Sequence, residues 1–139
     1  MKPVYINVDA ENLPTTEPHQ AVRVEHELLA RPIIVTAHRS PPAMTHGDAA
    51  KWAESLDIYG WSWRLPTVEE AFLICDRTRK DAVLPPEHFP DCDGEWIWTS
   101  TPTGWKSGAA WLVNLDGGSS NWGYHGNGFH ARAVRAGQF

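Results

Sequence analysis

The chain has 139 residues, of which 42% are hydrophobic and 21% charged, and its formal net charge is −5. This length is enough for one domain that buries its own core, so residues 1–139 are expected to form a single domain. The acidic balance makes DNA or RNA an unfavourable main partner, because contacts to phosphate backbones need a local surplus of lysine and arginine.

Three strands are expected in the first part of the chain, at residues 4–8, 21–26 and 33–35. The first is rich in β-branched and aromatic residues, and the second alternates apolar and polar residues. Between them, Pro14 and Pro18 predict a loop. Pro32 stands at the start of the third strand, a position where a strand tolerates the missing N–H. Residues 1–42 are therefore predicted to be strands and loops.

Two helices are predicted next. The first runs from His46 to Asp57, with Thr45 as its N-cap and Gly60 in its C-cap region. Apolar residues recur at helical spacing along it.

The second helix is predicted to open at Pro66 and to fade near Lys80. Thr67 and Glu70 have the spacing of a capping box, in which a hydroxyl and a carboxylate each bind an otherwise unpaired backbone N–H. The residues expected on its inward face are Ala71, Phe72, Ile74 and Cys75.

The rest of the chain is predicted to be strand and loop, with strands at residues 95–100, 109–115, 121–124 and 131–135. Asp116-Gly117-Gly118 predicts a hairpin turn, because such turns need positive φ angles that Asp and Gly tolerate. Strands at both ends with two helices between them predict an α+β domain in which N- and C-terminal strands pair.

The most specific motif is Trp63-Arg64-Leu65-Pro66-Thr67 followed by Glu70, and it precedes Phe89-Pro90, Trp96 to Ser100 and Ala131 to Arg135. In this order the motifs resemble the family typified by the C-terminal domain of collagen-like bacterial adhesins, over about residues 43–136. The resemblance implies a C-type-lectin-like fold, with two helices and antiparallel sheets. That fold is shared with formylglycine-generating oxidases and with phage receptor-binding proteins that retroelements diversify. Ala71 and Phe72 depart from the family's usual Leu, and Trp98 replaces part of its Tyr-Trp pair.

We interpret this motif as structural. Trp63 and Leu65 are expected to pack inward, Pro66 sets φ for helix entry, and Arg64 is expected to pair with a carboxylate or with backbone carbonyls. The alternative is that Arg64 is a functional cation. Because each buried tryptophan removes a large apolar area from water, four tryptophans are assigned to the core: Trp63, Trp96, Trp98 and Trp111.

Enzyme chemistry is not predicted. The sequence has no Gly-x-Ser-x-Gly elbow, P-loop or dinucleotide fingerprint. An oxidase of the formylglycine-generating type would need reactive cysteines that bind copper, and neither Cys75 nor Cys92 has an obvious cationic neighbour that would favour its thiolate. Two reduced thiols are the preferred reading of this pair, and a single disulfide is the alternative.

No metal or other cofactor is expected either. Asp91, Asp93 and Glu95 alternate around Gly94 in a pattern that suits a partial calcium cage, but a solvated acidic turn is the preferred interpretation. The seven histidines lack the close pairing of zinc ligands, and even His125 and His130 are read as structural or surface residues.

The best functional signal is the composition of residues 101–108 and 117–130, which mix Gly, Ser, Asn and aromatic residues as binding loops do. In the retroelement-diversified proteins of this fold, the corresponding C-terminal strands and loops form the variable binding face. The predicted binding residues are Trp105, Asn121, Trp122, Tyr124, His125 and Asn127. The alternative reading is that the glycines build tight turns and that Trp122 and Phe129 belong to the core.

The sequence thus predicts a non-enzymatic recognition module that binds a protein partner. One alternative is an inhibitor, encoded by a phage or mobile element, that blocks a host complex. Others are a calcium-independent carbohydrate-binding module and the oxidase considered above. The N-terminal residues lack a signal-peptide core and no run is long enough to span a membrane, so a cytoplasmic protein is expected, with a virion-associated one as the alternative.

Overall fold

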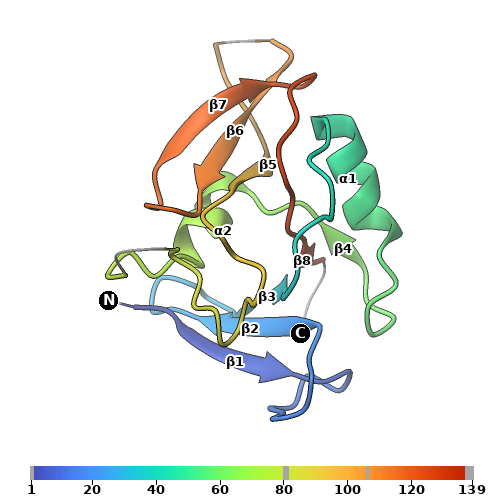
Figure 1. Cartoon of the computed structure of the whole chain (residues 1–139), viewed down its shortest axis with the longest axis vertical. Coiled ribbons are helices and arrows are strands. Elements are labelled where there is room, and N and C mark those ends of the chain that lie inside the picture. Colours follow the sequence, from blue (N-terminus) through green and yellow to red (C-terminus); the bar gives the residue numbers. More distant parts are fainter. Residues whose placement is uncertain (1, 80–81, 106, 137–139) are drawn as a thin grey trace.

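The structure is a computed structural model that describes residues 2–79, 82–105 and 107–136. Over these residues two helices and two antiparallel sheets form a mixed α/β arrangement (Figure 1). The elements in chain order are β1 (Val4–Val8), β2 (Ala21–Glu25), β3 (Ile33–Thr36), α1 (His46–Ser55), β4 (Trp63–Arg64), α2 (Val68–Leu73), β5 (Trp96–Pro102), β6 (Ala109–Asn114), β7 (Ser120–Tyr124) and β8 (Val134–Arg135). No helix in the described ranges has the length and apolar character needed to cross a membrane.

The larger sheet has the strand order β1-β2-β3-β8-β4. Antiparallel pairing of β3 with β8 places Val35 opposite Val134, so an N-terminal strand pairs with the C-terminal strand as predicted. On the other side of β8, Trp63 of β4 lies opposite Arg135. The pairing explains how a strand of only two residues, which the sequence did not predict, is held in place.

The smaller sheet has the strand order β5-β6-β7. Its second hairpin turns at Asp116-Gly117-Gly118 as predicted, with Gly118 at φ +78° and its N–H donating to the Asn114 carbonyl at 2.7 Å. Antiparallel pairing then places Trp111 directly opposite Trp122.

The two sheets occupy opposite ends of the molecule, and a core lies between them (Figure 1). Part of this core contains Val35, Ile74, Phe89, Ile97 and Val113, from the larger sheet, the segment between α2 and β5, and the smaller sheet. A second part lies against α1 and contains, among others, Ile34, Ala49, Ala53, Trp63, Trp98 and Leu112. Aromatic and aliphatic side chains from both sheets thus share one interior, which removes their apolar surface from water.

Both helices are shorter than predicted. Helix α1 begins after the N-cap Thr45 as expected but ends at Ser55, and its C-cap is Leu56. Gly60 instead lies in the following turn, where it and Tyr59 have φ angles of 72° and 60°. The prediction that Gly60 ends the helix is therefore wrong.

Helix α2 ends at Leu73, well before Lys80, which itself lies outside the described residues. The helix stops because Asp76 makes other bonds. Its N–H donates to the Val83 carbonyl at 2.8 Å, and its carboxylate accepts from the Thr78 N–H and hydroxyl. Such side-chain bonds compete with helix continuation.

The last strand is also shorter than the predicted range of residues 131–135, since β8 holds only Val134–Arg135. The residues before it still pair with the end of β3 and with the chain that follows it. The carbonyl of Ala131 accepts from the Ser40 N–H at 2.8 Å, and that of Ala133 accepts from the Thr36 N–H at 2.9 Å. The remaining strands agree with the predicted ranges to within two residues.

Candidate recognition face

The Trp63-to-Thr67 motif holds the start of α2, and its Pro66 carbonyl accepts from the Ser100 N–H of β5 at 2.8 Å. Arg64 donates two hydrogen bonds to the Glu70 carboxylate, at 2.7 and 2.9 Å, and a third to the Leu65 carbonyl at 3.2 Å. The capping box is present, because Glu70 also accepts from the Thr67 N–H and the Thr67 hydroxyl accepts from the Glu70 N–H. Burial raises the pKa of Glu70, but the bonds from Arg64 and Thr67 outweigh it and hold that pKa below its ordinary value.

The other members of the motif pack inward. Trp63, Leu65 and Pro66 are buried, and the Trp63 indole N–H donates to the Ile58 carbonyl at 3.2 Å. Trp98 is fully buried and donates to the Met44 carbonyl at 2.9 Å. These contacts give each indole both an apolar surrounding and a hydrogen-bond acceptor.

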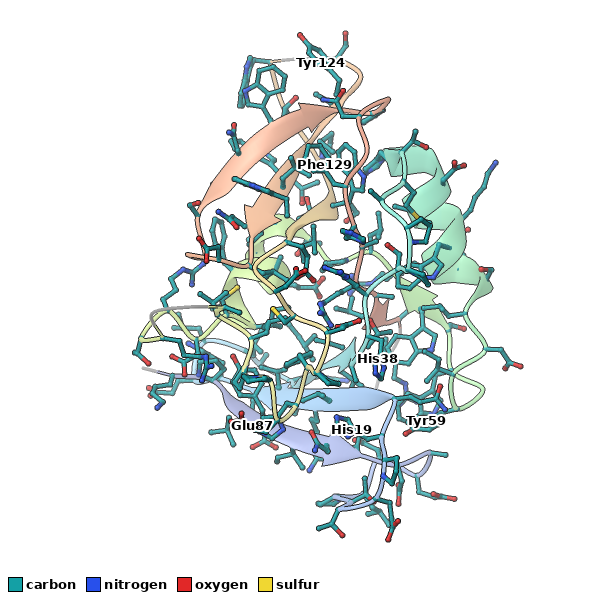
Figure 2. The ribbon with its side chains drawn as sticks, viewed as in Figure 1. His19, His38, Tyr59, Glu87, Tyr124 and Phe129 are labelled. Carbon is teal, nitrogen blue, oxygen red and sulfur yellow. The ribbon has the colours of Figure 1, made fainter. Side chains whose placement is uncertain are left out.

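Four aromatic side chains form a row on the smaller sheet, and we call Trp105, Trp111, Trp122 and Tyr124 the aromatic row. Trp105 packs edge-on against Trp111 with ring centroids 5.3 Å apart, and Trp122 packs edge-on against Tyr124 at 5.1 Å. Because Trp111 lies opposite Trp122 across the paired strands, the two aromatic pairs share one face of the sheet. Trp105 is 64% exposed and Tyr124 47% exposed. Figure 2 shows Tyr124 at the outer tip of the molecule.

The assignment of four tryptophans to the core is right for two of them. Trp63 and Trp98 are buried, but Trp96 and Trp111 are only partly buried. Trp111 is partly buried in strand β6 between the buried Ala110 and Leu112, and Val113, which shares its face of the sheet, is fully buried. Sequence reasoning missed Trp111 as a surface residue because a tryptophan in an apolar run is typical of a core strand.

A pocket of about 240 Å³ opens beside β7. Its walls are Trp96, Leu112, Asn121, Trp122 and Phe129. The Asn121 side-chain oxygen accepts from the Trp122 N–H at 2.8 Å. The pocket therefore combines aromatic walls with one amide, and it contains two of the predicted binding residues together with three that were not predicted.

His125 is exposed, and its ring stacks on His46 at the start of α1 with centroids 4.5 Å apart and planes 12° from parallel. The His46 N–H donates to the His125 carbonyl at 3.0 Å, and the His125 N–H donates to the Gly108 carbonyl at 2.8 Å. These bonds bring together the two predicted loops, residues 101–108 and 117–130, although Lys106 lies outside the described residues. Asn127 is exposed in the same turn.

The His46 ring also contacts residues of the protein interior. One of its nitrogens lies 3.0 Å from the Thr99 carbonyl oxygen, and its edge packs on Trp98. Burial lowers the pKa of His46, and the neighbouring His125 lowers it further, while the bond to Thr99 opposes both. Nothing in the sequence linked residues 46 and 125, because they are distant in the chain and joined by no motif.

The acidic segment around Gly94 is not the solvated turn that the sequence predicted. Glu95 is buried, and its carboxylate lies 3.1 Å from the fully buried guanidinium of Arg132. Asp91 lies 2.7 Å from the same guanidinium, and Asp93 pairs with Arg39 at 2.7 Å. Burial raises the pKa of Asp91, but Arg132 and the Arg39 N–H outweigh it and lower that pKa. Arginines that are distant in sequence thus take the place of water around Glu95 and partly around Asp91, whereas the Asp93 side chain remains 66% exposed.

Both cysteines are free thiols. Cys75 is buried, its thiol donates to the Ala71 carbonyl at 3.2 Å, and burial raises its pKa to about 12. Burial also raises the pKa of the partly buried Cys92. Such thiols are protonated at neutral pH and are poor nucleophiles and metal ligands. Within the described part of the chain, no three His, Cys, Asp or Glu side chains gather in a way that could hold a metal ion.

Comparison with protein-family models matches the Lcl C-terminal domain over residues 14–135. The chain belongs to the Lcl C-terminal domain family. The match begins at residue 14, where the motif resemblance began only at about residue 43, so this Lcl C-terminal domain also includes β2 and β3. Membership indicates an adhesin-like domain. Neither the curated proteins nor the solved structures gave a match.

Proposed function

We propose that this Lcl C-terminal domain is a non-enzymatic recognition module that binds a protein partner through the aromatic row and the loops beside it. The observation that carries the proposal is the exposure of Trp105 and Tyr124, each packed edge-on against a second aromatic ring. Aromatic side chains that are exposed side by side are typical of surfaces that bind a partner. They also supply much of the binding free energy at protein interfaces.

The neighbouring polar residues suit such a role. Asn121 and Asn127 are exposed and can form hydrogen bonds at the rim of an interface. The turn that follows β7 is joined to α1 through His125 and His46 and to the 101–108 loop through Gly108. A face that is ordered before binding loses less conformational entropy when the partner arrives.

The absence of enzymatic activity is part of the proposal. An oxidase would need a reactive thiolate, whereas Cys75 lies in the core with its pKa raised to about 12. Removal of both thiols should leave partner binding intact, so the double variant Cys75→Ala/Cys92→Ser provides a direct check.

We further propose that the fold is C-type-lectin-like. Its support is the pairing of β3 with β8, which joins the two ends of the chain in one sheet, together with a separate three-stranded sheet that carries the loops. Superposition of an experimental structure on C-type-lectin-like domains tests this assignment. A different order of strands in either sheet would reject it.

The binding proposal is tested by affinity capture from the native host, with mass spectrometry to identify the partner and calorimetry to measure its affinity. The triple variant Trp105→Ala/Tyr124→Ala/His125→Ala should weaken binding by at least about 100-fold, because it removes the exposed anchors. The matched control is Leu13→Ala/Leu28→Ala, which removes two side chains of 58% and 65% exposure outside the proposed face. Unchanged affinity of the triple variant would reject this face.

A carbohydrate ligand is the second candidate, and the pocket beside β7 favours it. Aromatic walls stack on sugar rings, and the Asn121 amide offers hydrogen bonds to hydroxyls. Binding on a glycan array that survives a chelator and is lost in Asn121→Ala would support this candidate. If the same variant still bound the protein partner, the aromatic row would bind that partner independently of the pocket beside β7.

A further inference from the structure

A second pocket, of about 280 Å³, lies on the larger sheet and is separate from the aromatic row. Its apolar lining residues are Leu29, Ala30, Pro32 and Ile33, from the end of the β2–β3 connection and the start of β3. Its charged lining residues are Arg31, Arg64, Glu70 and Arg135. The pocket thus combines apolar and charged residues.

Strand pairing brings the charged residues together. Strand β8 lies between β3 and β4, and its Arg135 lies opposite Trp63, next to Arg64 in the chain. Arg31 belongs to the connection that precedes β3. Residues far apart in sequence thereby place three arginines in the lining of one cavity.

The lining contains three arginines and one carboxylate. The carboxylate is engaged within the lining, because Glu70 accepts two hydrogen bonds from Arg64 and one from the Thr67 N–H. The Arg135 guanidinium carbon lies 4.2 Å from the centre of the Trp61 ring, which is a cation–π contact.

We propose that this pocket binds a carboxylate attached to a small apolar group, as at the C-terminal residue of a peptide with an aliphatic side chain. Guanidinium groups bind carboxylates through two parallel hydrogen bonds, a geometry that the Arg64–Glu70 pair in the pocket wall already has. The apolar residues of the lining accommodate the aliphatic group. The volume is at the low end of the range for ligand pockets, which suits one or two residues.

The test uses the whole chain and two small probes, N-acetyl-leucine and N-acetyl-leucinamide, which differ only in the carboxylate. Titration followed by NMR, with the Trp61 indole signal as reporter beside Arg135, should show binding of the acid at least about tenfold tighter than that of the amide. Acetate and inorganic phosphate should both bind more weakly than N-acetyl-leucine, because neither has an aliphatic side chain that can contact the apolar residues of the lining. Equal affinity for acid and amide, or tighter binding of phosphate, would overturn the proposal.

Variants locate the site. Arg31→Gln should weaken binding of N-acetyl-leucine about tenfold, since it removes one of the converging cations. Lys51→Gln, on the exposed surface of α1, removes the same charge outside the pocket and should leave affinity unchanged. Equal losses of affinity in the two variants would show that the ligand is held only by general electrostatic attraction to the protein, and would reject the site. Leu29→Ser should weaken binding of N-acetyl-leucine but not of acetate, and urea unfolding would verify that each variant is folded.

Discussion

The guanidinium of Arg132 lies 3.1 Å from the carboxylate of Glu95, and the two side chains are 0% and 4% exposed. The same guanidinium donates to the Ala37 carbonyl at 2.9 Å and to Asp91 at 2.7 Å. It therefore joins the chain after β3, the segment before β5 and the segment before β8, which connect the two sheets. A buried charge is tolerated only with such partners, because its desolvation costs several kcal/mol.

Replacement of Arg132 by Met should lower the free energy of unfolding by about 3–5 kcal/mol, because Glu95 would be left buried with only Arg39, at 3.7 Å, as a counter-charge. Urea unfolding measures this loss. The double variant Arg132→Met/Glu95→Leu should recover most of it. Glu25→Gln is the control, because Glu25 belongs to the more exposed pair with Arg23 and its removal should cost less than about 1 kcal/mol. A cost for Arg132→Met no larger than that of the control would contradict the role of the network.

The Glu70 carboxylate should make stability depend on acid pH. Its pKa is lowered in the folded protein, so it stabilises the fold above its unfolded pKa of about 4.3, and this contribution is lost as the pH falls through the folded pKa. Glu70→Gln should therefore cost about 1–2 kcal/mol at pH 7 and progressively less below about pH 4. Urea unfolding between pH 3 and pH 7 tests this. Glu69→Gln, exposed in the same helical turn, should change stability by less than about 0.5 kcal/mol at every pH.

Much of the local structure was predictable because its causes are local. The capping box of α2 depends on Thr67 and Glu70 three residues apart, and the β6–β7 turn depends on Asp116 and the glycines next to it. The first strands follow from β-branched residues and alternation. Each of these signals lies within a few residues of the structure that it determines.

The contacts that escaped prediction join distant residues. The carboxylates around Gly94 read as a solvated turn because their arginine partners, Arg39 and Arg132, lie far away in the chain. The candidate site was predicted only in part, because contacts between distant parts of the chain also determine which of its residues are exposed. The exposure of Trp105 follows from its glycine-rich loop, whereas the partial exposure of Trp111 depends on which parts of the chain cover its face of the smaller sheet, where Val113 is fully buried.

The stack of His46 on His125 should weaken as the pH falls. Burial lowers the pKa of His46 below the ordinary value of about 6.5, so the unfolded chain takes up a proton before the folded one does. The stabilisation is present above the unfolded pKa and is lost as the pH falls towards the folded pKa. His46→Gln, whose amide can still donate to the Thr99 carbonyl, should therefore show a smaller fall in unfolding free energy between about pH 7 and pH 5.

His88 also has a pKa lowered by burial, so the wild-type slope contains its contribution, and only the difference between wild type and variant reports on His46. Substitution of the exposed His38 by Gln provides the control for removal of a histidine elsewhere. If both variants have the wild-type pH dependence, the stack does not respond to protonation. Asp48 lies in the same first turn of α1 and partly offsets the charge of a protonated His46, which limits the size of the effect.

Gly123 controls the space beside β7. A Cβ atom at this position would lie 3.0 Å from Cε2 of Phe129 and 3.1 Å from Cδ1 of Leu112, both of which line the pocket. Gly123→Ala must therefore displace a wall of the pocket, and we expect a loss of about 1–3 kcal/mol in unfolding free energy together with a smaller cavity. Gly47→Ala is the control, because a Cβ there meets nothing within 4 Å and should stabilise α1 by about 0.5 kcal/mol.

The same substitution separates the two candidate ligands. Phe129 lies nearer the middle of the molecule than Tyr124 does (Figure 2), so a displaced Phe129 ring alters the pocket while Trp105 and Tyr124 keep their exposed positions. If a protein partner is bound by the aromatic row, its affinity for Gly123→Ala should remain within about threefold of wild type, whereas a sugar held in the pocket should be lost. Calorimetry with the captured partner and a glycan array measure the two outcomes. Loss of the protein partner in a variant that urea unfolding shows to be folded would instead place the pocket inside the protein interface.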